Sequence, residues 1–130
     1  MIRRRIYFPV ALALLAVGLI VPATAGDWLP REEAIKNLAS SYAFMVLCST
    51  HGHAKIEPVS KLGEAYQSRM AADAYDAFRD QYQSSLTDKK IYSIANKRWV
   101  AFQINEQGCE TVDRAAEMYL QRLAPAPLIN

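Results

Sequence analysis

The sequence lacks the short motifs that carry most recognisable enzyme chemistry. It has no G-x-S-x-G nucleophile elbow, no phosphate-binding loop, no dinucleotide fingerprint and no C-x-x-C-H haem attachment site. These absences exclude the mechanisms that such motifs build, although a helical hydrolase need not carry one. We therefore lean away from an enzyme and expect no cofactor.

The sequence also lacks an excess of charge of either sign. Three of its 15 basic residues are Arg3, Arg4 and Arg5, so the chain after residue 25 has 12 Lys and Arg against 13 Asp and Glu. A near-neutral body offers no concentrated basic patch for nucleic acid and no reason to bind an anionic membrane surface. We expect neither a nucleic-acid partner nor stable membrane insertion of this body.

A long apolar run occurs near the start of the chain, from Val10 to Val21. The three arginines precede it, Pro22 ends it, and the small-x-small tripeptide Ala23–Ala25 follows, which is the order of a secretory signal. The alternative is an uncleaved anchor over residues 6–25, which is just long enough to span a bilayer. We predict that residues 1–25 are a cleaved signal peptide, and that a single domain over residues 26–130 is exported to the periplasm.

Cysteine is scarce, with two residues in the chain, Cys48 and Cys109. Two cysteines in an exported chain most often pair, so we predict a Cys48–Cys109 disulfide. It would enclose about 62 residues, and the chain-entropy model gives such a bridge about 4 kcal/mol of stabilisation.

Strand-like alternation of useful length is absent, and three- and four-residue apolar spacing recurs instead. In the first such segment, Pro30 suits the first helical position, and Ile35, Leu38 and Tyr42 share one face. The fold class we expect is all-α, a small bundle of four to five helices with a loose tail from about residue 124. The expected helices are 30–49, 57–71, 73–86, 88–107 and 110–123, of which the second and third could be continuous.

The aromatic residues divide into expected core and expected surface. In the helix predicted over 88–107, Trp99 and Phe102 follow the apolar face and are assigned to the core. Trp28, Tyr66 and Tyr92 are the candidates for a partner-binding surface, because Tyr and Trp are favoured at protein interfaces. Asp73, Asp76 and Asp80 lie opposite an aromatic helix face, which is typical of a solvated stripe.

The Cys48, His51 and His53 cluster could hold copper or zinc, or make an activated Cys–His pair. A disulfide at Cys48 removes the thiolate from both schemes, which leaves His51 and His53 as weak metal candidates on a polar turn. We therefore predict no catalytic residues and no dedicated metal site.

The leading functional hypothesis is a non-enzymatic periplasmic module that binds another periplasmic or envelope protein, as inhibitors, immunity proteins and accessory subunits do. It depends on export and on the absence of a catalytic set. The alternatives are a periplasmic acid-stress chaperone and weak copper or zinc binding through His51 and His53.

Overall fold

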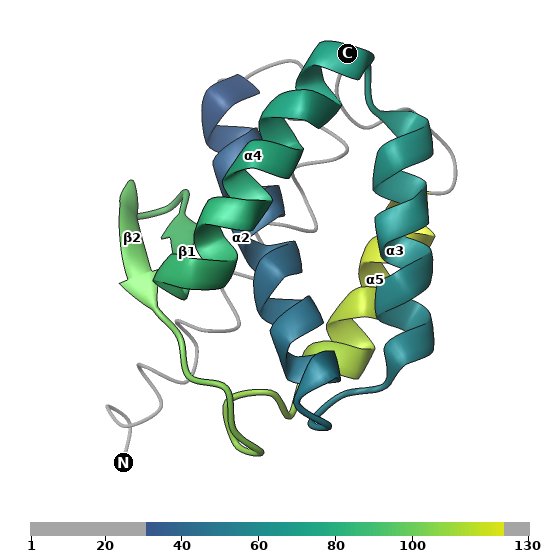
Figure 1. Ribbon diagram of the computed structural model, residues 1–130, viewed down its shortest axis with the longest axis vertical. Helices are drawn as coiled ribbons and strands as arrows, with labels where there is room; N and C mark the ends of the chain where they lie inside the picture. The colour runs from purple at the N-terminus through teal and green to yellow at the C-terminus, as the bar shows by residue number, and fades with distance from the viewer. Residues whose placement is uncertain (1–30, 124–130) are drawn as a thin grey trace.

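The computed structural model describes residues 31–123, which form four helices and one two-stranded sheet (Figure 1). The predicted signal peptide, Trp28 and the tail beyond Leu123 lie outside the described residues. In chain order the elements are α2 (Arg31–Thr50), α3 (Ile56–Arg69), α4 (Ala72–Asp88), β1 (Lys90–Ser93), β2 (Arg98–Ala101) and α5 (Val112–Leu123).

Helix α2 is the centre of the fold. Glu32 and Glu33 in its first turn suit the positive end of the helix dipole. Its buried residues lie on all sides of the helix rather than along one stripe, and several are Ala or Ser, which let neighbouring backbones approach closely. Helix α4 and strand β1 have their main contacts with α2, and α3 packs against it as well.

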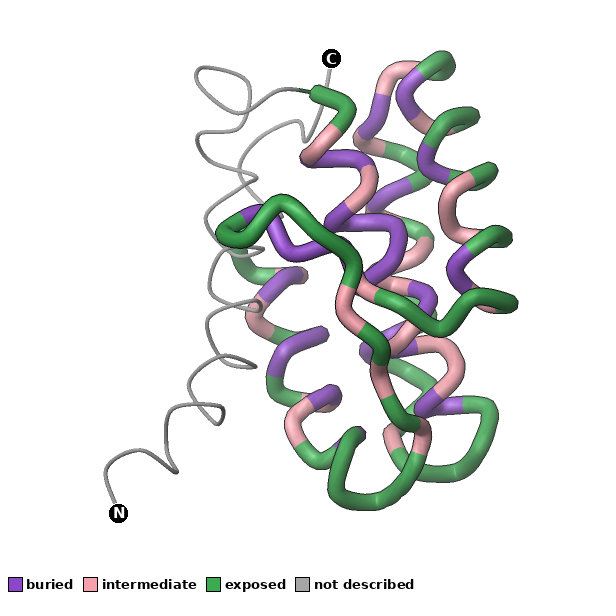
Figure 2. The backbone as a smooth tube through the Cα atoms, turned by 90° about the vertical axis from the view of Figure 1, so that its left-hand side faces the viewer, coloured by how far each residue is buried: buried purple, intermediate pink, exposed green. Residues whose placement is uncertain are grey.

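The helices form two pairs. Helix α4 lies along α2, and α5 lies along α3, which runs beside them (Figure 1). The backbone amide of Lys55 donates to Asp113 Oδ1 at 2.8 Å, which ties the start of α3 to the start of α5. Residues that are buried lie mainly on the inner sides of the helices, and exposed residues lie on the outer sides and in the loops (Figure 2).

The predicted disulfide is confirmed. Cys48 in the last turn of α2 is bonded to Cys109, in the loop that leads into α5, with a Cα–Cα distance of 5.8 Å. Both residues are buried, so the bridge joins the central helix to the second helix pair from inside the core. A disulfide is compatible with an oxidising exported compartment. Among residues 31–123, no helix combines the length and the apolarity needed to cross a bilayer.

Helices α3 and α4 are separate. Met70 and Ala71 both have extended backbone between them, with ψ angles of 148° and 154°, so the alternative of one continuous helix is wrong. The other expected helices correspond to α2, α3, α4 and α5 with ends shifted by one or two residues.

The helix predicted over 88–107 is wrong, because most of this segment is an antiparallel β-hairpin. Helix α4 continues to Asp88 and stops at Lys89, whose φ of 56° is left-handed. Strands β1 and β2 then pair with Tyr92 opposite Trp99, and Lys97 provides a second left-handed residue, φ 53°, in the turn. An all-α class is therefore only approximately right for a mostly helical fold.

Two polar side chains of α2 hold β1 in place. The buried amide of Asn37 donates from Nδ2 to the Tyr92 carbonyl oxygen at 2.9 Å. The Tyr92 backbone N–H donates to Ser40 Oγ at 3.0 Å, and that hydroxyl donates in turn to the Lys36 carbonyl at 2.6 Å. The helix thus satisfies the edge of β1 as a neighbouring strand would.

We predict that replacing both cysteines by Ala lowers the free energy of unfolding by about 4 kcal/mol, because the unfolded chain loses a long covalent loop. The measurement is guanidinium unfolding of the double variant beside the oxidised protein. A loss below about 1 kcal/mol would contradict the assigned role of the bridge.

We predict that Ser40→Ala lowers the free energy of unfolding by about 1–3 kcal/mol, because the buried Tyr92 N–H is left without an acceptor. Hydrogen exchange at the Tyr92 amide should accelerate beyond the change seen at other core amides. Ser60→Ala, at an exposed position of α3, is the matched control and should change stability by less than about 0.5 kcal/mol. Equal effects of the two substitutions would be evidence against the Ser40 bond.

Candidate binding site

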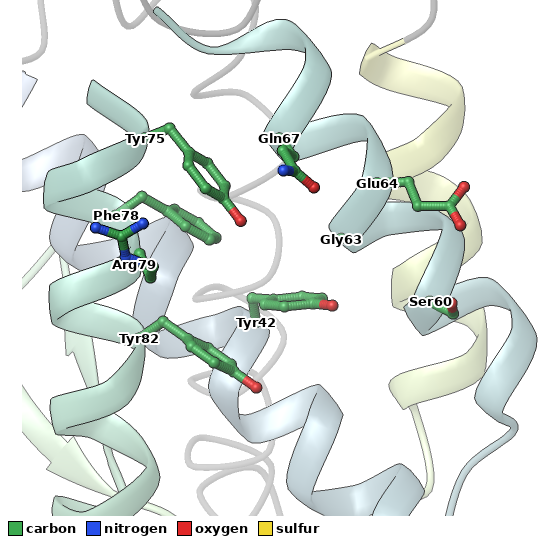
Figure 3. A pocket seen from close by; sticks show the side chains of 9 residues that line it. All are labelled: Tyr42, Ser60, Gly63, Glu64, Gln67, Tyr75, Phe78, Arg79 and Tyr82. Atoms are coloured by element: carbon green, nitrogen blue, oxygen red, sulfur yellow. The ribbon is translucent and has the colours of Figure 1, made fainter. Parts of the chain in front are cut away.

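A groove opens between α3 and α4, which diverge from their connection at residues 70–71 (Figures 1 and 3). Its volume is about 320 Å³, near the lower end of the range for sites that hold small ligands. We call it the tyrosine groove, and it is lined by Tyr42, Ser60, Gly63, Glu64, Gln67, Tyr75, Phe78, Arg79 and Tyr82.

Aromatic rings make one wall and the floor of the tyrosine groove. Tyr75, Phe78 and Tyr82 lie three and four residues apart, so they share one face of α4. Tyr42 enters from α2 beneath them, with ring centroids 5.4 Å from Tyr82 and 6.1 Å from Phe78. The hydroxyls of the three tyrosines extend from these rings toward α3 (Figure 3). The groove thus offers apolar ring surface and hydroxyl groups to the same occupant.

Gly63 explains how Tyr42 fits beneath α3. A Cβ atom at this position would overlap the Tyr42 hydroxyl oxygen and lie 2.9 Å from Cζ of the ring. A glycine inside a helix costs about 1 kcal/mol relative to Ala, so its presence in α3 has a steric reason. The close approach fixes the Tyr42 side chain across the gap between α2 and α3.

Two of the groove tyrosines, Tyr42 and Tyr82, have raised hydroxyl pKa values. Burial, and after it the neighbouring Tyr82 and Tyr75, raise the pKa of the Tyr42 hydroxyl to about 12. The Glu64 carboxylate adds to the same shift. Burial also raises the pKa of Tyr82. At neutral pH these hydroxyls are therefore uncharged groups that can both donate and accept hydrogen bonds.

The rim of the groove is polar and exposed. Ser60, Glu64 and Gln67 of α3 stand on one side. On the other side, Arg79 Nη2 lies 3.4 Å from Asp76 Oδ1, so its charge is paired one helical turn away. The lining includes neither His nor Cys, and the arrangement is suited to holding an apolar group beneath a polar rim.

Tyr66 does not form a surface, contrary to the sequence prediction. It is 1% exposed, and its ring packs edge-on against Tyr42, with centroids 5.6 Å apart, and in a tilted arrangement against Phe78, with centroids 4.9 Å apart. Burial raises the pKa of its hydroxyl well above the ordinary value. Tyr66 therefore supports the floor of the groove from inside the core.

Tyr92 and Trp99 have the opposite of their predicted exposures. Tyr92, a surface candidate, is 7% exposed beneath the Lys36 ammonium, which lies 5.2 Å from its ring centroid. Trp99, assigned to the core, is 38% exposed on β2 and packs against Tyr92 at 5.2 Å. Phe102 is half-buried against Phe44 of α2, with ring centroids 4.8 Å apart. The hairpin reverses the assignments because β1 faces α2 and β2 does not.

His51 and His53 are exposed on the turn after α2. His51 Nδ1 lies 2.9 Å from the Leu47 carbonyl oxygen, so this nitrogen carries the proton and donates. Cys48 is bonded to Cys109, so it supplies no thiolate to the turn that carries the two histidines. Within residues 31–123, no group of three or more His, Cys, Asp or Glu side chains could hold a metal ion.

The acidic stripe of α4 is exposed, with ion pairs at two of its residues. Arg31 Nη2 lies 3.0 Å from Asp73 Oδ2, and its hydrogen bond and charge lower the pKa of that carboxyl. Asp76 pairs with Arg79, and Asp80 is exposed beyond them. Exposed pairs of this kind contribute little to stability.

Sequence reasoning did not find the groove itself. The i, i+3, i+7 spacing of Tyr75, Phe78 and Tyr82 was visible, and Gly63 inside a helix was a signal of a close approach. The partner of Gly63 is Tyr42, 21 positions earlier, and such a pairing has no local signature. Comparisons with models of known protein families, with curated proteins and with solved structures found no match.

We predict that Gly63→Ala lowers the free energy of unfolding by about 1–3 kcal/mol, because its Cβ displaces the Tyr42 ring. Adding Tyr42→Phe should recover part of the loss, because the atom in closest conflict is the hydroxyl oxygen. Denaturant unfolding of the two single variants and the double variant measures this coupling. A Gly63→Ala protein about 1 kcal/mol more stable than the parent would instead mark Gly63 as an ordinary helix-weakening residue.

Proposed function

We propose that this chain is a non-enzymatic binding protein of an oxidising exported compartment, the periplasm, and that its tyrosine groove holds part of another exported or envelope protein. The observation that carries the proposal is the groove itself, in which four aromatic rings and three hydroxyls lie beneath an exposed polar rim. Tyrosine supplies large contact area with few rotatable bonds, and it is enriched among the residues that dominate protein interfaces.

The surroundings of the groove support a binding role. Its floor is closely packed, because the Tyr42 ring lies against Tyr82 and Phe78 and its hydroxyl end lies against Gly63. A preorganised floor lowers the ordering cost of association. Glu64 supplies the carboxylate of the rim, beside the neutral side chains of Ser60 and Gln67, and it forms no ion pair with another described residue. Such a rim suits reversible contact with a protein surface.

The test is site-specific photocrosslinking in cells that export the full chain. We expect a photoreactive residue at Gln67, on the rim, to give an adduct with one exported protein. The same residue at Arg114, exposed on α5, should give none. Tyr75→Ala, which removes one wall, should abolish the Gln67 adduct, while Asp80→Ala on the solvated side of α4 should leave it intact.

The opposing results are equally specific. No adduct at Gln67, equal adducts at Gln67 and Arg114, or an adduct unaffected by Tyr75→Ala would each overturn the proposal. Circular dichroism and thermal unfolding of the Tyr75→Ala protein show whether the helices persist, so that loss of the adduct is assigned to the groove.

An acid-stress chaperone and weak copper or zinc binding at His51 and His53 stay predictions. Protection of client proteins near pH 2–3 would test the first, and equilibrium dialysis of the oxidised protein with each metal would test the second. Neither measurement depends on the Gln67 adduct, so either result is separable from the crosslinking experiment.

A further inference from the structure

The two edges of the β-hairpin differ in how their backbone groups are satisfied. On β1, the N–H and C=O of Tyr92 both point to α2, where they meet Ser40 Oγ at 3.0 Å and Asn37 Nδ2 at 2.9 Å. Because these groups point away from β2, Tyr92 and its partner Trp99 form a non-hydrogen-bonded pair of the ladder.

The same alternation sets the direction of the backbone groups on β2. The Phe102 amide donates to the Lys89 carbonyl at 3.1 Å, which marks that pair as hydrogen-bonded and agrees with the alternation. The N–H and C=O groups of Trp99 and Ala101 therefore point outward, along the edge of β2 away from β1. Both residues are exposed, and β2 lies on the outside of the molecule (Figures 1 and 2).

The hairpin is strongly basic. No acidic residue occurs from Lys89 to Asn105, whereas Lys89, Lys90, Lys97 and Arg98 do. Lys97 Nζ lies 3.1 Å from Glu33 Oε2, so the Lys97 ammonium forms an ion pair with a carboxylate of α2. Lys89, Lys90 and Arg98 make no ion pair with another residue of the described range, and all three are exposed.

We propose that the outer edge of β2 binds an extended acidic segment of a partner protein, which adds a third strand to the hairpin. Main-chain bonds to Trp99 and Ala101 would supply the pairing, and the Trp99 ring would pack on the added strand. Carboxylates of the segment would face Arg98 of β2, as opposite charges do in stable cross-strand pairs, and Lys89 and Lys90, one strand further away, would add positive potential.

The charge of the hairpin favours this occupant over a second copy of the chain. Two β2 strands side by side would place the basic residues of both copies in one small sheet, and like charges across strands are destabilising. Charges along an edge strand also oppose self-association in natural sheets. An acidic strand turns the same residues into attractive partners. The proposal does not depend on the tyrosine groove.

The test uses the full chain and a synthetic probe, a seven-residue peptide in which Glu alternates with Val. Its matched control peptide has Gln in place of each Glu. We expect the Glu peptide to shift the backbone NMR resonances of β2 and to bind at least about tenfold more tightly than the Gln peptide. Raising the salt from about 50 mM to about 500 mM should weaken its binding, because exposed charges are screened.

Two variants of one residue separate pairing from charge. Ala101→Pro removes an outward N–H and leaves the β1–β2 ladder bonds in place, since Pro is tolerated where the N–H of an edge strand faces solvent. Ala101→Thr keeps the N–H. We expect the Pro variant to bind the Glu peptide at least about tenfold more weakly than the Thr variant. Thermal unfolding and the amide spectrum of residues 90–93 confirm that the hairpin persists.

Equal binding by the two variants would overturn the proposal. So would peptide-induced shifts confined to α3 and α4, or Glu and Gln peptides of equal affinity. Sedimentation of the protein alone gives the remaining outcome. A concentration-dependent dimer that Ala101→Pro abolishes would make a second copy the occupant of the β2 edge and would also refute the proposal.

Discussion

The fold depends on burying one helix on every side. An element at the edge of a domain needs one apolar stripe, but α2 is covered by α4, by α3 and by the hairpin. Its inward residues are therefore partly small and partly polar, and the polar ones need partners within the protein. Asn37 and Ser40 have those partners in the backbone of β1. The hairpin is thus placed by the same requirement that makes α2 central.

The helices were predictable because their signals are local. Apolar spacing in each helix, Pro30 before α2 and Pro58 in the first turn of α3 all act within a few residues of the element that they define. The disulfide was predictable for a different reason, since two cysteines allow one intramolecular pairing. The buried surroundings of α2 were partly visible too, because its second half is apolar on two sides.

The hairpin was not predictable from the same signals. Tyr92 and Trp99 are seven residues apart, so a helix would place them on one face, while the hairpin places them directly opposite each other. Short apolar segments fit both periods, and the choice between them is made elsewhere in the chain. The acceptor that holds the Tyr92 amide lies 52 positions earlier, on Ser40. Which strand faces α2, and hence which aromatic ring is exposed, follows from that distant contact.

The two proposed surfaces lie on opposite faces of α2. At about 100° per residue, Tyr42 is turned by about 170° from the mean direction of Asn37 and Ser40. Phe44 lies on the same face of α2 as Asn37 and Ser40, and it packs on Phe102 of the segment that follows β2. The groove and the hairpin edge share no lining residue and are separated by a helix that is itself packed on all sides.

This separation constrains how a partner can use both surfaces. A compact partner seated in the tyrosine groove cannot also lie along β2, because the body of α2 and α4 stands between them. Occupation of both sites requires either two partners or one partner with an extended segment that passes around the fold. Because the sites share no side chain, a substitution in one should leave affinity at the other nearly unchanged unless it disturbs α2 itself. Coupling between them would have to pass through Tyr42, Asn37 and Ser40 along the central helix.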